Sequence, residues 1–365
     1  MIRGFSKTTL AGVVLLAAGC AAAPVGETAG PVPAAPDTVT APDPEPSPPL
    51  GTPPPDPDPI PPPPPPPPEP EPVVPPPPPP TRQPAPATAG PLTSPAPVPE
   101  VPVLDGAVMP RERILAYYGN PASTRMGILG ELPPDQMLAR LDGQVAAWER
   151  ADPFTPVRPA LHLIAVMAAS DPGEDEMYRI RMPSWRIEQV KEWADTRNAL
   201  VFLDIQPGRS TVQAELPRLE RWLIEPHVHL ALDPEWAMGP DGIPARRIGS
   251  MTADEVNHAI EFLARIVDEH QLPPKVLVVH RFTQGMLRNA RDIRLDPRVQ
   301  VVIHMDGWGP PAQKIRTYRD FIVPEATQFT GFKIFYHNDL RNNSRLMTPE
   351  EVLRLRPVPF YIQYQ

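Results

Sequence analysis

Short apolar runs and amphipathic stretches alternate along residues 106–365 of the chain. Each apolar run is rich in β-branched or aromatic residues, which is typical of strands that are buried on both faces. The runs predict eight strands, at residues 114–118, 160–169, 199–208, 227–236, 275–282, 299–309, 329–339 and 359–365.

The stretches between these runs predict helices. They lie at residues 135–152, 184–198, 211–226, 252–272, 284–292, 313–321 and from Pro349 onward. Ser184 is the expected N-cap of the second helix, and Pro217 should lie early in the third helix or bend it. Thr252 and Glu255 have the spacing of a capping box at the start of the most regular helix.

Strands that alternate with helices predict a parallel sheet with both faces covered. Eight such units in a segment of this length match an α/β fold of the (β/α)8 TIM-like barrel class. An open, doubly wound sheet is the alternative. The first expected strand, however, is not followed by the Gly-rich phosphate loop that many open sheets carry.

The first twenty residues, MIRGFSKTTLAGVVLLAAGC, have the features of a secretory signal peptide. Arg3 and Lys7 are positively charged, and the apolar run at 10–18 is shorter than the ~20 residues that span a membrane. LAAGC resembles the lipobox of bacterial lipoproteins, which implies cleavage after residue 19 and lipidation of Cys20. Cys20 is the only cysteine, in keeping with that role. A cleaved and fully secreted protein is the alternative.

Residues 20–105 consist mostly of Pro, Ala, Thr and acidic residues, with unbroken proline runs at 61–68 and 75–80. Such a segment cannot bury enough apolar surface to offset its conformational entropy. We therefore expect a disordered, extended, lipid-anchored linker that holds the 106–365 domain away from the cell membrane, on its extracytoplasmic face. A proline-rich recognition motif is the alternative.

The net charge of −9 arises almost entirely in this linker. Residues 106–365 are nearly neutral and carry no basic stripe. The sequence therefore predicts no nucleic-acid partner.

Polar residues follow several of the predicted strands at their carboxyl ends, the face on which (β/α)8 barrels carry their active sites. They are Asp204, Gln206, Asp233, Glu235, Trp236, His280, His304, Asp306, Trp308 and Tyr336. Residues two apart on a strand share a face, so Asp233 lies on the side of Ala231, and His304 lies on the side of Asp306. We expect these side chains to converge over the barrel mouth.

Two neighbouring carboxylates suit glycoside hydrolysis, in which one group gives a proton to the leaving oxygen and the other is ionised. Closely spaced acids in a partly apolar site acquire different pKa values, which creates these two roles. The prediction assigns catalysis to Glu235, Asp233 and Asp306. The flat faces of Trp236 and Trp308 would stack on sugar rings.

The motif LALDPEW, which holds Asp233 and Glu235, resembles the fourth-strand D-x-E of barrel glycosidases, notably the family-25 muramidases and more loosely the family-18 chitinases. The resemblance implies that Glu235 is the proton donor and Asp233 its partner. It also implies that Asp306 matches a sixth-strand aspartate of the muramidases. The other predicted strand-end residues, Asp204, Gln206, His280, His304 and Tyr336, would contact substrate.

The leading hypothesis is a surface-tethered, glycoside-hydrolase-like protein that acts on cell-wall or extracellular polysaccharide, such as peptidoglycan, without a cofactor or metal. Three alternatives remain. Asp233 before Pro234 fits a simple turn in which Asp caps backbone donors. The barrel could bind glycan or another envelope component without chemistry. Lastly, His280 and His304 could hold the metal of a metal-dependent hydrolase.

Overall fold

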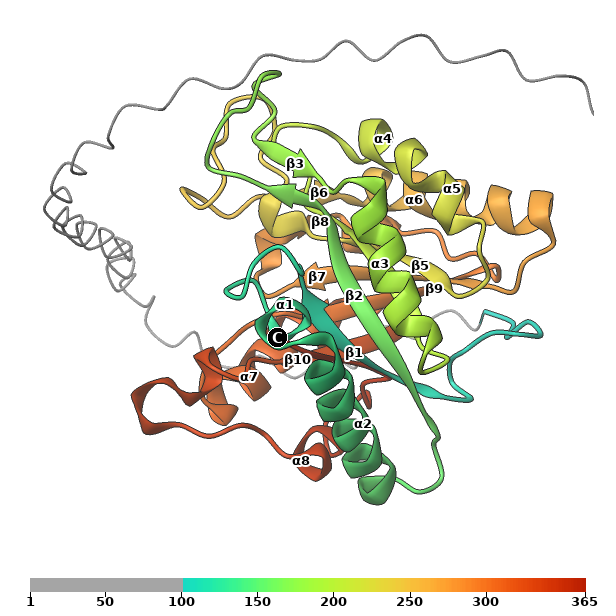
Figure 1. Cartoon of the computed structure of the whole chain (residues 1–365), viewed down its shortest axis with the longest axis vertical. Helices are drawn as coiled ribbons and strands as arrows, with labels where there is room; N and C mark the ends of the chain where they lie inside the picture. Colours follow the sequence, from blue (N-terminus) through green and yellow to red (C-terminus); the bar gives the residue numbers. More distant parts are fainter. Residues whose placement is uncertain (1–100) are drawn as a thin grey trace, which may run out of the picture. The chain divides into compact units, whose positions relative to one another are not determined.

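The computed structural model describes residues 101–365 (Figure 1). The predicted signal peptide, Cys20 and nearly all of the predicted linker lie outside the described residues, so the lipid anchor and the linker remain predictions. Within residues 101–365, every helix is too short or too polar to cross a membrane.

Eight parallel strands form a closed barrel. Their order around the barrel is β1, β11, β10, β9, β7, β5, β4 and β2, and β2 pairs with β1 to close the ring. The strands are β1 (Arg113–Gly119), β2 (Val157–Ala168), β4 (Leu200–Ile205), β5 (Val228–Leu232), β7 (Lys275–Arg281), β9 (Val299–Met305), β10 (Phe329–Ile334) and β11 (Tyr361–Tyr364). Each overlaps one predicted strand. The (β/α)8 barrel prediction is therefore confirmed, and the open-sheet alternative is wrong.

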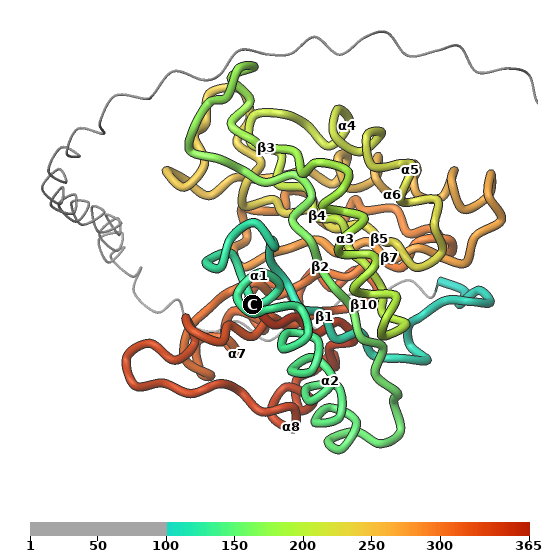
Figure 2. Tube along the Cα trace, in the orientation of Figure 1, coloured from blue at the N-terminus to red at the C-terminus, as the bar shows by residue number. Residues whose placement is uncertain are grey.

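Three shorter strands lie outside the ring of eight. β3 (Arg179–Arg181) pairs antiparallel with the end of β2, and β6 (Met251–Thr252) pairs with β8 (Leu287–Arg288) outside the main sheet. The chain ends beside α1 (Ile128–Glu131), as the trace in Figure 2 shows, because the Gln365 side chain packs against Gly127.

Helices cover the outside of the barrel (Figures 1 and 2). Besides α1 they are α2 (Pro134–Ala151), α3 (Ser184–Asp195), α4 (Val212–Glu215), α5 (Glu220–Leu223), α6 (Ala253–His270), α7 (Pro311–Thr317) and α8 (Pro349–Leu353). The capping box at the start of α6 is confirmed, because Thr252 and Glu255 exchange both hydrogen bonds. Pro217 lies in a 3-10 turn between α4 and α5, so the predicted single helix is broken there.

Two helix predictions are wrong in detail. Ser184 is the first residue of α3, and Pro183 occupies the N-cap without a side-chain hydrogen bond. Residues 284–292 form two 3-10 turns around β8 rather than one short helix. Asn289 in this segment has a left-handed backbone, φ 57°, which interrupts any helical run.

The core has two apolar parts because alternate strand residues face opposite sides of the sheet. The outer part, between strands and helices, includes Leu277 and Val279. The inner part fills the barrel with side chains of the opposite phase, including Val276, Val278 and Phe202. Inward-facing residues become polar toward the carboxyl ends of the strands, and this change in polarity defines the site.

Candidate active site

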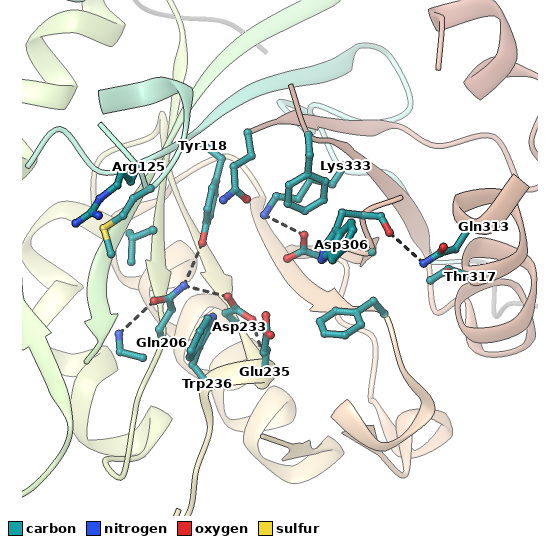
Figure 3. Close-up of a pocket in the computed structure, with 18 residues that line it drawn as sticks. Tyr118, Arg125, Gln206, Asp233, Glu235, Trp236, Asp306, Gln313, Thr317 and Lys333 are labelled. Carbon is teal, nitrogen blue, oxygen red and sulfur yellow. Dashed lines mark hydrogen bonds and ion pairs between the residues drawn. The ribbon is translucent and has the colours of Figure 1, made fainter. Parts of the chain in front are cut away.

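A cavity of about 560 Å³ opens at the carboxyl ends of the barrel strands (Figure 3). Its size is within the range of small-ligand sites. Of the predicted site residues, it is lined by Gln206, Asp233, Glu235, Trp236, Asp306 and Trp308. The prediction that acids from separate strands meet at the barrel mouth therefore agrees with the position of these side chains.

Asp233 lies on one wall of this cavity in a fixed position. One carboxylate oxygen accepts a hydrogen bond from the Gln206 amide at 3.1 Å, and the other accepts one from the backbone NH of Glu235 at 3.3 Å. The same Gln206 amide donates to the Tyr118 hydroxyl at 3.1 Å, and its carbonyl oxygen accepts from Ala168 N at 3.2 Å. Asp233 therefore caps a turn, as the alternative interpretation held, and also lines the cavity.

Glu235 reaches the cavity through a turn and not through strand alternation. β5 ends at Leu232, and Pro234–Trp236 form a 3-10 turn whose N-cap is Asp233. Proline cannot donate to the strand ladder, which favours an end to the strand at this point. The turn leaves Glu235 half-buried beside Asp233, and both side chains point into the same space (Figure 3).

Asp306 lies across the cavity and is held by two basic side chains. Its Oδ1 is 2.9 Å from Lys333 Nζ, and its Oδ2 is 2.8 Å from His280 Nδ1. Lys333 also lies 3.8 Å from the centre of the Tyr118 ring, a cation–π distance. Oxygens of Asp233 and Asp306 lie within 4.8 Å of each other, so the two walls are close.

The acids differ in their electrostatic surroundings. Burial raises the pKa of Glu235 to about 8, and the negative charges of Asp233 and Asp306 add to that effect. Burial also raises the pKa of Asp233, against the opposing influence of His280. Burial would raise the pKa of Asp306 too, but Lys333 and His280 hold it below its usual range. One cavity thus presents a protonated carboxyl and an ionised carboxylate near neutral pH.

Aromatic side chains line the cavity near these acids. Trp308 is 47% exposed, and the Arg341 guanidinium lies 5.2 Å from the centre of its ring. Trp236 is partly exposed, and Phe282 and Phe335 add apolar surface. An exposed indole beside polar groups can stack on the apolar face of a ring-shaped ligand.

Three predicted substrate contacts lie too deep for that role. Asp204, His280 and His304 are fully buried and do not line the cavity. Their position follows from the barrel's stagger, which sets how far each strand end rises toward the mouth. The ring of His304 packs against Gly331, where a Cβ atom would overlap it.

Tyr336 lies on the other side of the sheet, so its predicted contact with substrate is corrected here. The Tyr336 hydroxyl is 2.8 Å from that of Tyr117, and its ring stacks on Tyr364. The guanidinium carbon of Arg140, in α2, lies 3.7 Å from the centre of the Tyr336 ring. Lys333 and Phe335 are two residues apart and both face the cavity, so Tyr336, the next residue, faces the helices.

Several residues that line the cavity were not among the predicted site residues. Tyr118, Arg125, Lys333 and Gln365 all line the cavity. Lys333 had a usable signal, because it is a lone charge in the apolar run FTGFKIF. Tyr118 is the next-to-last residue of β1 and faces the same side as Ala116, which packs inside the barrel. Arg125 belongs to a loop, where no periodicity indicates direction.

The fold and the cavity define a class: a (β/α)8 barrel with acids gathered in its mouth. No protein-family profile matches the chain, and no curated protein gives a significant match. Among solved structures, the chain is similar to Cellulase Cel5C_n, with 12% sequence identity and a TM-score of 0.35. The match covers 61% of this chain and 65% of that chain, so the chain spans less than two thirds of the cellulase. This likeness concerns the fold alone.

Proposed function

We propose that this protein is a glycoside-hydrolase-like enzyme that acts on cell-wall or extracellular polysaccharide. The observation that carries the proposal is the pair of contrasting acids in one open cavity. Glu235 has a pKa raised to about 8, and Asp306 is ion-paired with Lys333 on the facing wall. Glycoside hydrolysis needs such a pair, one carboxyl protonated and one ionised.

In this mechanism Glu235 donates its proton to the leaving glycosidic oxygen. Asp233 acts on Glu235, because its carboxylate, when ionised, favours the protonated form of the glutamate. The ionised Asp306 faces the positive charge that develops on the sugar ring. Water then adds to the ring carbon that lost the leaving oxygen, and the proton that this water releases replaces the one that Glu235 gave. Lys333 can donate hydrogen bonds to sugar hydroxyls. Trp308 supplies a flat apolar face for the ring.

The cellular setting belongs to the same proposal. A lipid on Cys20 would anchor the protein to the extracytoplasmic face of the cell membrane, and residues 20–105 would let the barrel reach nearby glycan. The features LAAGC and the long proline runs support this part.

The test is turnover of cell-wall glycan and soluble polysaccharides by the purified full chain, measured as released reducing ends. Glu235→Gln should lower turnover by about 100-fold or more, because it keeps the shape of the side chain and removes its acid. Glu192→Gln, the same change at an exposed position of α3, is the matched control.

A barrel that binds glycan without cleaving it is the second candidate. It is favoured by the engagement of both Asp306 oxygens with Lys333 and His280, which leaves neither oxygen without a partner. Glycan binding by both wild type and Glu235→Gln, with no reducing ends from either, would establish this candidate and remove the first. A metal-dependent hydrolase that uses His280 and His304 is not supported, because neither histidine reaches the cavity.

A further inference from the structure

Below the cavity floor, three buried side chains from three strands of the barrel point at one another. Asp204 Oδ2 lies 3.4 Å from His162 Nε2 and 3.6 Å from His280 Nε2. All three side chains are fully buried, and their ligand-type atoms lie within 4.8 Å of one another. His162 belongs to β2, Asp204 to β4 and His280 to β7.

These facing atoms have no hydrogen-bond partners within residues 101–365, the part of the chain that the structure describes. This holds for the Nε2 atoms of His162 and His280 and for both carboxylate oxygens of Asp204. A buried polar atom without a partner costs about 1–3 kcal/mol, so four in one place need an explanation.

The other ring nitrogens, in contrast, are fixed. His280 Nδ1 contacts Asp306 at 2.8 Å, and His162 Nδ1 contacts the Tyr361 hydroxyl at 2.6 Å and the Gln363 amide at 3.0 Å. Turning the Gln363 amide over brings its unpartnered Oε1 to a proton on His162 Nδ1. Both Nε2 atoms are then free of hydrogen and can ligate. Metal-binding histidines are commonly held through the second nitrogen in this manner.

We propose that His162, Asp204 and His280 bind a divalent transition metal, for which zinc is the best match. Zinc bonds to nitrogen and carboxylate oxygen at roughly 2.0–2.1 Å, so ligand atoms of a tetrahedral site lie roughly 3.3–3.5 Å apart. Of the two observed separations, 3.4 Å lies within that range and 3.6 Å lies about 0.1 Å above it. Two imidazoles and one carboxylate suit zinc better than magnesium or calcium, which prefer oxygen ligands throughout.

A second triplet, Asp233, His280 and Asp306, also lies within 4.8 Å, but its atoms already have partners. Asp233 accepts from Gln206, and Asp306 pairs with Lys333 and with His280 Nδ1. Within the described part of the chain, Asp306 Oδ1 lacks a hydrogen bond but faces the Lys333 ammonium at 2.9 Å, which would repel a metal ion. The facing atoms of the deeper triplet have no such cation beside them among residues 101–365, so the ion is assigned there.

The proposed zinc is structural, and it would meet the proposed active site through His280, whose Nδ1 contacts Asp306. The Tyr118 ring lies 5.1 Å from the His162 ring and 5.9 Å from the His280 ring, and it also lines the cavity. The ion would thus lie beneath the floor of the cavity and would cross-link β2, β4 and β7. Loss of zinc would weaken the barrel without requiring any change in the choice of substrate.

The test measures zinc binding by the full chain, expressed without a polyhistidine tag and stripped of metal. Zinc alone is titrated against a chromophoric chelator, and thermal unfolding is followed with and without zinc. We expect one zinc per chain and a higher unfolding temperature with zinc. Asp204→Asn should weaken binding by about 100-fold or more. His229→Gln, which removes a buried histidine elsewhere in the barrel, should leave zinc binding unchanged.

Substoichiometric zinc on the wild type, or equal affinity in Asp204→Asn and His229→Gln, would overturn the proposal. If Asp204→Asn does not fold, the test is the visible absorption spectrum of the wild-type protein loaded with Co²⁺. Strong visible absorption of a four-coordinate ion supports the site, and its absence overturns it. Failure here leaves the reducing-end assay with Glu235→Gln untouched, so the two proposals can fail separately.

Discussion

The raised pKa of Glu235 predicts a pH-dependent difference in stability between wild type and Glu235→Gln. The folded protein holds the Glu235 proton up to about pH 8, whereas the ordinary value of 4.5 applies when the chain is unfolded. Between these values the native state binds more protons than the unfolded state, so the free energy of unfolding falls as pH rises. The contribution is fully present below about pH 4.5 and is lost by about pH 8.

The size of the effect follows from the same values. A difference of one pKa unit corresponds to about 1.4 kcal/mol, so the interval from 4.5 to about 8 sets an upper limit of about 5 kcal/mol. Glutamine cannot ionise and escapes this loss. The stability of Glu235→Gln relative to wild type should therefore rise with pH between these limits. The slope should not exceed about 1.4 kcal/mol per pH unit. The measured slope of stability against pH should be smaller than this limit for two reasons. Glu235 is only half-buried, and part of its raised pKa comes from the charge of Asp233, which changes with pH as well.

The assay is urea unfolding at several pH values between 4 and 9, and it needs no substrate. The quantity compared is the difference in the free energy of unfolding between variant and wild type, because the titration of groups that do not interact with Glu235 cancels in that difference. Glu192→Gln, on the exposed side of α3, supplies the baseline. A Glu235→Gln difference that stays level across this range, or that falls as pH rises, would refute the assignment of Glu235 as a proton-holding acid.

Three further outcomes are expected. The kcat/KM for glycan cleavage should fall about tenfold per pH unit above about pH 8, because Glu235 must be protonated; a pH–rate profile that stays level there contradicts this role. Lys333→Met should lower the free energy of unfolding by about 3–5 kcal/mol by leaving Asp306 buried without its ammonium partner. Adding Asp306→Asn should recover part of that loss in urea unfolding, and strictly additive losses would exclude the coupling. Trp308→Ala should raise the Kd for glycan with little change in Tm, whereas Trp185→Ala, at an exposed indole on α3, should change neither.

The barrel was predictable because its strands are buried on both faces. Each therefore forms a continuous apolar run, and the runs VFLDI and VLVVHR carry this signal without help from distant residues. Capping is equally local, which explains the correct assignment of Thr252 and Glu255. The prediction of a helix at 284–292 was wrong because part of this segment forms β8. β8 pairs with β6, which is distant in sequence, so no local pattern indicates it.

The site was predictable only in part, because depth in a barrel depends on register. The alternation of strand residues predicted the correct face of the sheet for Asp306. It does not predict depth along the barrel axis, and Asp204 lies below the cavity floor. Tyr336 follows the end of β10, where counting alternate residues from Lys333 would have placed it outside. Glu235 reached the cavity through the Pro234 turn, a route that strand alternation does not describe.

The positions of the cations, rather than of the acids, decide the roles within this cavity. Glu235 and Asp306 are both withdrawn from bulk water, and burial alone would raise the pKa of each. Lys333 and His280 both contact Asp306 directly, and both side chains are buried inside the barrel. Two identical functional groups are thus driven to opposite protonation states by partners that the strand register fixes in place.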